Sequence, residues 1–74
     1  MNPAAAVPTV EQLLELEREH PRHTSTKDLT IRRVLGITPA RFYQLLHRAV
    51  LNGTATPIDP QTAGRVRARL DRTR

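Results

Sequence analysis

Residues 31–49 read IRRVLGITPARFYQLLHRA, and this stretch decides the fold. Gly36 separates two segments that have helical spacing of apolar residues, and Thr38 and Pro39 follow it closely. A glycine just after a helix can adopt the left-handed backbone conformation, whereas threonine and proline favour the start of the next helix. The stretch therefore predicts two helices joined by a short turn at residues 35–38.

The spacing of apolar residues around Gly36 indicates a helix-turn-helix. The motif needs apolar side chains five and one residues before the glycine, and one, six and nine residues after it. This chain has Ile31, Leu35, Ile37, Phe42 and Leu45 there. Each of these side chains can face a small core between the two helices and a third helix behind them.

The flanking sequence predicts two further helices. Thr9 and Gln12 have the form of a capping box, so a helix should begin there and run to about Glu19, before Pro21. Asp59 and Pro60 repeat the cap-and-proline start, and Ala63, Val66 and Leu70 then form an apolar stripe. The expected fold is all-α, a compact bundle of four short helices with no β wing. Residues 1–8 should form a flexible arm, and residues 9–72 a single domain.

The helix before Gly36 is expected to start at a cap on Ser25 or Thr26. Its apolar residues have roughly helical spacing. We expect Leu29, Val34 and Leu35 to face the core, with Ile31 on the flank.

The charge is unevenly distributed. The chain has 12 Lys and Arg against 7 Asp and Glu, a formal net charge of +5, yet residues 1–19 hold four glutamates and one arginine. The later segments are therefore basic, and all but one of the cations are arginines. Arginine matches phosphate oxygens and guanine edges better than lysine does. A polyanionic partner follows as a hypothesis, although many such charge runs are only solvated surface.

Several classes of function lack the residues they need. There is no cysteine, so disulfides and thiolate chemistry are excluded, and Ser25 is the one serine. His20 and His23 have Pro21 between them, which argues against a shared metal. We therefore expect no enzyme, cofactor or metal site. The absence of a long apolar run or a basic leader predicts a cytoplasmic protein that does not enter a membrane.

The helix after the turn is expected to carry the DNA-binding face. A period of 3.6 residues turns Phe42 and Leu46 inward and Tyr43, Gln44 and His47 outward. Glutamine can pair with adenine, and arginine with guanine or phosphate. The expected contacts to double-stranded DNA are Thr38, Ala40, Arg41, Tyr43, Gln44, His47 and Arg48, with Lys27, Arg32 and Arg33 on the preceding helix.

A protein partner is the alternative. Helical modules that bind proteins have the same spacing, and the acidic first helix could contact RNA polymerase or another host protein. A homodimer is also possible, because such proteins often place two helices in successive major grooves. A small transcriptional regulator would fit either role.

The segments LLELEREH (residues 13–20), TIRRVLGITPARFYQLLHRAV (residues 30–50) and IDPQTAGRVRARL (residues 58–70) together resemble a family of small proteins. The family comes from actinobacteria and their phages and is known as a domain of unknown function. The resemblance implies a helix-turn-helix fold and a regulatory, nucleoid-associated or phage accessory role. It lends no settled activity.

Overall fold

A computed structural model describes residues 7–72. Most of the flexible arm expected at residues 1–8 lies outside this range. Helix α1, Val10–Glu19, begins at the expected capping box. The Thr9 hydroxyl accepts a hydrogen bond from the Gln12 N–H at 3.1 Å, and the Gln12 side chain accepts one from the Thr9 N–H at 2.8 Å. The helix ends just before Pro21, as predicted.

The second helix has two parts. Helix α2, Ser25–Thr30, continues directly into η2, Ile31–Leu35, which is a π-helical turn. Gly36 follows with φ of 69°, in the left-handed region. The sequence therefore placed the end of this helix correctly, because only glycine adopts that conformation at little cost.

The cap of α2 lies earlier than predicted. The Thr24 hydroxyl accepts the hydrogen bond from the Lys27 N–H at 3.1 Å, and Thr24 has the extended backbone of a cap. Ser25 and Thr26 are already helical. The prediction of a cap at either of these two residues is wrong, because three consecutive hydroxyl residues offer equivalent caps to sequence reasoning.

The inward face of α2 and η2 also differs from the prediction. Ile31 is fully buried, whereas Leu29 and Val34 are 57% and 67% exposed. Each hydrogen bond of a π turn spans one residue more than in an α-helix, which shifts the helical phase. Ile31 and Leu35 thereby stay on the core side while Val34 turns to solvent.

Helix α3, Pro39–Leu51, follows the connection Gly36–Thr38. The Thr38 hydroxyl accepts a hydrogen bond from the Arg41 N–H at 3.1 Å, which caps the helix as predicted. The helix ends at Leu51, its C-cap is Asn52, and Gly53 beyond it has φ of 86°.

Helix α4, Pro60–Arg72, starts beside Asp59. The Asp59 carboxylate accepts a hydrogen bond from the Thr62 N–H at 3.1 Å. Hydrogen bonding to the Thr62 side chain, and then to its backbone N–H, lowers the pKa of Asp59.

Within the connector before α4, Ala55 is fully buried, and its N–H donates to the Ala49 carbonyl at 3.1 Å. The connector is thereby fixed against α3.

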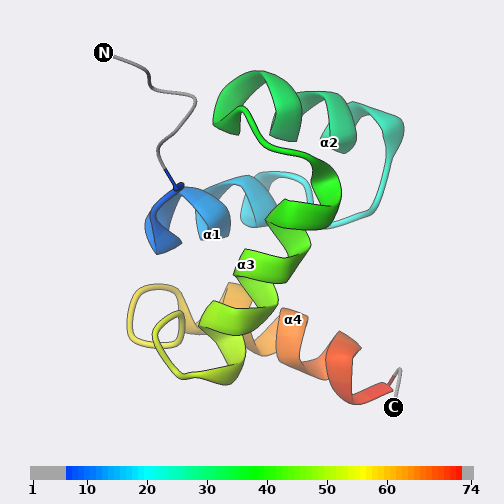
Figure 1. Cartoon of the computed structure of the whole chain (residues 1–74). Coiled ribbons are helices and arrows are strands. Elements are labelled where there is room, and N and C mark those ends of the chain that lie inside the picture. The colour runs from blue at the N-terminus through cyan, green and yellow to red at the C-terminus, as the bar shows by residue number, and fades with distance from the viewer. Residues whose placement is uncertain (1–6, 73–74) are drawn as a thin grey trace.

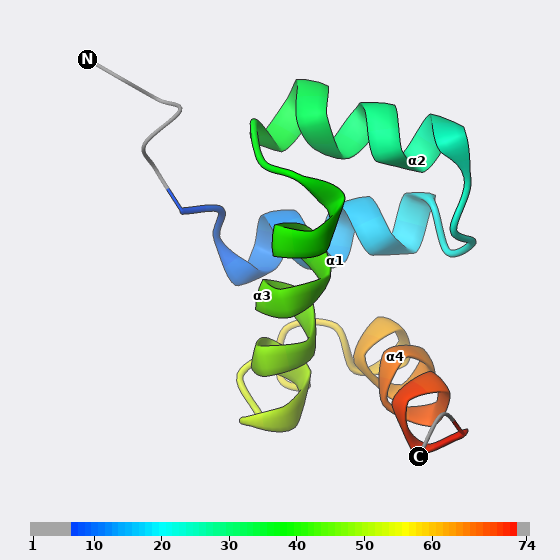
Figure 2. The same ribbon diagram turned by 45° about the vertical axis from the view of Figure 1, so that its right-hand side comes forward.

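The helices form a small all-α bundle, as predicted. Helices α1 and α2 lie side by side, α3 crosses them, and α4 lies beside the C-terminal half of α3 (Figures 1 and 2). Helix α3 contacts α1, η2 and α4, so it is the centre of the packing. Residues 7–72 contain no strand, and none of their helices is long and apolar enough to cross a membrane.

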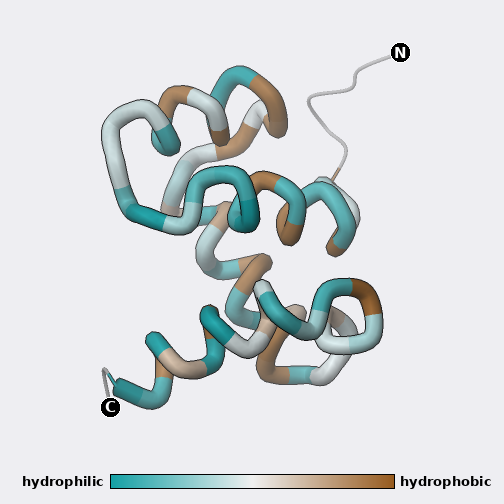
Figure 3. Tube along the Cα trace, turned by 180° about the vertical axis from the view of Figure 1, so that it is seen from behind, coloured by the Kyte–Doolittle hydropathy of each residue, from teal (hydrophilic) through white to brown (hydrophobic). Residues whose placement is uncertain are grey.

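The core lies where these helices meet. Apolar residues are interspersed with polar ones along the helices, as expected of amphipathic elements (Figure 3). The five apolar residues placed around Gly36 by the motif all belong to the core or pack against it, with Ile31 and Phe42 fully buried. The buried apolar residues are Leu13, Leu14, Leu16, Ile31, Phe42, Leu46, Ala49, Val50, Ala55, Ala63 and Val66.

Candidate nucleic-acid interface

Helix α3 has one side free of the core. Ala40, Arg41, Gln44 and Arg48 are exposed on it, and we call these four residues the exposed α3 face. The helix contains no acidic residue. Arg41 Nη1 donates a hydrogen bond to Gln44 Oε1 at 2.7 Å, so these two side chains act as a pair. The face therefore presents two cations and several free N–H donors.

Tyr43 and His47 do not belong to this face, although the sequence predicts them there. Both are half buried at its edge. The Tyr43 hydroxyl lies 3.1 Å from Nδ1 of His23, in the linker between α1 and α2, and the Tyr43 ring packs edge-on against Phe42 at 5.1 Å. Of the expected trio only Gln44 is fully outward, because His23 of the linker and Arg69 and Leu70 of α4 cover the flank of α3 that carries the other two.

His47 lies in a hollow between α3 and α4. The hollow is lined by His23, Tyr43, His47, Arg69 and Leu70. Burial lowers the pKa of His47 below its ordinary 6.5, the Arg69 guanidinium lowers it further, and Glu17 acts in the opposite direction. The lowered pKa favours the neutral form of His47, and a neutral imidazole is a poorer contact for a phosphate than a charged one.

Lys27 was expected to contact the DNA backbone, and the structure contradicts this. Its side chain is fully buried. Its Nζ donates to Glu17 Oε1 at 2.5 Å and lies 4.9 Å from the centre of the Tyr43 ring. A buried ammonium needs such a partner, because desolvation of an unpaired charge is costly. Lys27 is therefore part of the core and not of a nucleic-acid surface.

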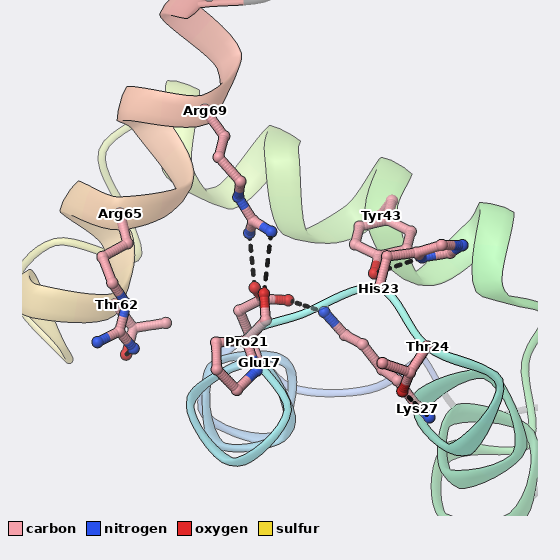
Figure 4. Close-up of polar contacts among 9 residues, drawn as sticks. All are labelled: Glu17, Pro21, His23, Thr24, Lys27, Tyr43, Thr62, Arg65 and Arg69. Carbon is pink, nitrogen blue, oxygen red and sulfur yellow. Dashed lines mark hydrogen bonds and ion pairs between the residues drawn. The ribbon is translucent and has the colours of Figure 1, made fainter.

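Glu17 is the centre of this buried charge cluster. One carboxylate oxygen accepts from Lys27, and the other accepts from Arg69 Nη2 at 2.6 Å (Figure 4). Arg69 also donates to the Pro21 carbonyl at 3.2 Å. One carboxylate thus joins α1, α2 and α4 beside the aromatic residues of α3.

Sequence reasoning missed this cluster, yet a signal exists. Glu17 lies four residues after Leu13 and three after Leu14, so it occupies the middle of an apolar stripe. Lys27 lies four residues before Ile31 on the next helix. A charge in the centre of an apolar face indicates a buried and paired group, because an unpaired one would not be stable there.

The remaining residues expected at the interface lie next to the start of α3. Arg32 and Arg33 are exposed on η2, directly before the connection to α3. Thr38 is exposed at the N-terminus of α3, where its hydroxyl already accepts the Arg41 N–H. These three residues are therefore exposed on the two elements that flank the turn, and Thr38 is bonded to Arg41.

The arginines of α4 divide into two groups. Arg67 donates to the Val50 carbonyl at 2.9 Å and so satisfies the C-terminal end of α3, and Arg69 belongs to the Glu17 cluster. Arg65 and Arg72 are exposed, and the Arg65 guanidinium lies 3.4 Å from the Thr62 hydroxyl. Half of these cations thus stabilise the fold, and the others remain available for a ligand.

A family model described as "Protein of unknown function (DUF3263)" matches residues 8–74. The chain belongs to this family. The match covers all the described helices and confirms the resemblance to a domain of unknown function. No curated protein and no solved structure matches the chain. A function must therefore be proposed from the geometry of its surface.

Proposed function

We propose that this member of the DUF3263 family binds double-stranded DNA by placing the exposed α3 face in the major groove. One observation carries the proposal: Arg41, Gln44 and Arg48 lie exposed on one side of a helix without acidic residues, whose opposite side is fixed in the core. An α-helix is about 10–12 Å wide, which fits a major groove of about 12 Å.

The elements around α3 support this placement. In a DNA-binding helix-turn-helix the first helix crosses the backbone while the second enters the groove. Here α2 and η2 would be the first helix, and Arg32 and Arg33 are exposed at its end, next to the turn. Arginines in that position can bind phosphates on either side of the groove.

The pairing of Arg41 with Gln44 favours guanine. Because Gln44 Oε1 already accepts from Arg41, the remaining hydrogen-bonding groups of the pair are mainly donors, namely the Gln44 amide N–H₂ and the other guanidinium N–H groups. Guanine presents two acceptors, N7 and O6, in the major groove, whereas adenine also presents a donor. We expect the preferred DNA sites to contain guanine opposite this pair. The protein would then act as a transcriptional regulator or as an accessory factor bound to the nucleoid.

The test is binding to random duplex DNA over a series of salt concentrations. We expect log affinity to fall linearly with log salt, with a slope of about −0.9 for each phosphate contact. Arg41→Ala and Gln44→Ala should weaken binding, and their matched controls Arg18→Ala and Gln61→Ala, on exposed positions of α1 and α4, should not. Unchanged affinity in both α3 variants, or no binding by the natural protein, would refute the proposal.

Sequencing of duplexes selected from the random pool tests the base preference separately. Enrichment of guanine that disappears in Arg41→Ala would support the role of the pair. Enrichment of adenine opposite Gln44 would show that the pair separates on binding.

A protein-binding module remains the second candidate, because Leu29 and Val34 are exposed on one helix. Two large apolar side chains in solvent are common on interaction surfaces. Leu29→Ser with Val34→Ser removes both apolar side chains without changing the charge, and should abolish binding to RNA polymerase or another host partner and leave DNA binding intact. Loss of DNA binding in this variant would argue against a separate surface.

A further inference from the structure

A pocket of about 220 Å³ lies on the side of the molecule where α4 meets the end of α1. It is lined by Glu17, Pro21, Arg65, Ala68, Arg69 and Arg72. Three of its six residues are arginines, spaced four and three apart along α4, so they share one side of that helix. Ala68 between them leaves the helix surface open to a ligand.

The charge in the pocket is not balanced by the protein. Glu17 is the one acidic residue among the six that line the pocket, and its two carboxylate oxygens already bind Lys27 and Arg69. One negative charge against two cations leaves the cluster positive. Arg65 and Arg72 add two further cations to the lining. The Asp59 carboxylate interacts electrostatically with Arg65, but neither arginine lies within ion-pair distance of an acidic group in residues 7–72.

Arg69 is held in place before any ligand arrives. Its bonds to the Glu17 carboxylate and the Pro21 carbonyl use two of its five N–H donors and fix the guanidinium plane (Figure 4). A fixed arginine loses less freedom on binding than a mobile one. Guanidinium groups match phosphate oxygens in paired hydrogen bonds.

We propose that this pocket binds a phosphate of the DNA backbone, as a second contact beside the α3 helix. Arg69 also lines the hollow that holds Tyr43 and His47 of α3, so the pocket and the flank of α3 adjoin the same guanidinium. The inference rests on the proposed DNA binding. It assigns the α4 arginines Arg65 and Arg72 to anchoring the protein, while the exposed α3 face selects the sequence.

The test compares the salt dependence of duplex binding in Arg65→Ala, Arg72→Ala and Arg18→Ala. Each of the first two should reduce the salt slope by about 0.9, the value for one lost phosphate contact, equally for all sequences. Arg18→Ala removes the same charge from α1, next to Glu11 and Glu15, and should keep the natural slope. Arg69 is left unchanged because its loss would also disturb Glu17.

The outcomes separate this inference from the proposed function. If Arg41→Ala weakens DNA binding but Arg65→Ala and Arg72→Ala keep the natural slope, the pocket assignment is wrong and the α3 proposal stands. A titration with inorganic phosphate, followed by NMR of the arginine side chains, provides the second readout. Saturable shifts that need Arg72, in a protein that does not bind duplex DNA, would overturn the DNA assignment in favour of a small anion.

Discussion

The Nζ atom of Lys27 lies 2.5 Å from Oε1 of Glu17, and the two side chains are 0% and 3% exposed. This ion pair joins α2 to α1, and Arg69 joins α4 to the same carboxylate. Helix α2 continues into η2, which carries Arg32 and Arg33 and leads into the turn before α3. The orientation of the proposed DNA-binding elements therefore depends on a charge cluster inside the protein.

Replacement of Glu17 by Gln should destabilise the fold strongly. The substitution leaves the buried ammonium of Lys27 without a counter-ion, and the loss of one partner of a buried ion pair costs about 3–5 kcal/mol. Urea denaturation would measure the free energy of unfolding. Glu15→Gln is the matched control, because Glu15 is exposed on the same helix, and it should change stability by less than about 0.5 kcal/mol. Equal stability of the two variants would contradict the role of Glu17.

Replacement of Lys27 by Met should cost less than Glu17→Gln. The carboxylate of Glu17 would keep its bond to Arg69, and the methionine side chain fills a similar apolar space. The order of the two variants in the same urea experiment tests whether the carboxylate is the centre of the cluster. A larger loss in Lys27→Met would show instead that the ammonium is the more important group.

Phe42→Ala should destabilise the protein by about 3–5 kcal/mol, the usual cost of removing a buried aromatic side chain. Phe42 is fully buried where α3 meets its neighbours. Its neighbour Tyr43 provides the control, because Tyr43→Phe removes only the hydroxyl near His23 and should cost about 1 kcal/mol or less. Thermal and urea unfolding of both variants would show whether the large effect is confined to Phe42.

Thr38→Ala should destabilise the protein by about 1 kcal/mol, because the N-terminus of α3 loses its capping hydroxyl. Thr38→Ser keeps a hydroxyl oxygen for the Arg41 N–H and should remain close to the natural stability. If both variants were equally destabilised, the methyl group rather than the cap would be responsible. The midpoints of urea unfolding measure the difference, provided that the unfolding free energy of each variant depends equally steeply on the urea concentration.

The stability should decrease as the pH falls through the ordinary pKa of histidine, because of His47. Its pKa is lowered in the folded protein, first by burial and then by Arg69, so the unfolded chain takes up a proton at higher pH than the folded one. Between these two pKa values acid favours unfolding, and the effect fades as the pH rises well above 6.5. Unfolding free energies between pH 8 and pH 5 should fall less steeply in His47→Gln. An identical pH dependence in both proteins would contradict a neutral His47.

Local sequence signals predicted most of the helix boundaries. The capping box at Thr9, the cap at Thr38 and the left-handed Gly36 each depend on a few adjacent residues, and each lies where the sequence placed it. The outward position of Val34 has a local cause too. The π turn at Ile31–Leu35 changes the helical phase, and a fixed period of 3.6 residues cannot anticipate it.

The candidate site was predicted less completely than the fold. Arg41, Gln44 and Arg48 are exposed as expected, because the helical period is enough to predict which residues of an amphipathic helix face solvent. Tyr43 and His47 lie at the edge of that side, where exposure depends on the neighbouring segments. The linker residue His23 and the α4 residue Arg69 cover this edge, and both are distant in the sequence.

The sequence by itself determined that this chain forms four helices and at which residues three of them are capped. It also determined that the helix after Gly36 is basic on its outer side. Only the tertiary structure decided that Lys27 is internal while Arg32 and Arg33 remain in solvent. The physical reason is that caps and periods act within one turn of a helix, whereas a charge can be buried only when another helix supplies its partner. For Lys27 that partner is Glu17, ten residues earlier on a different helix.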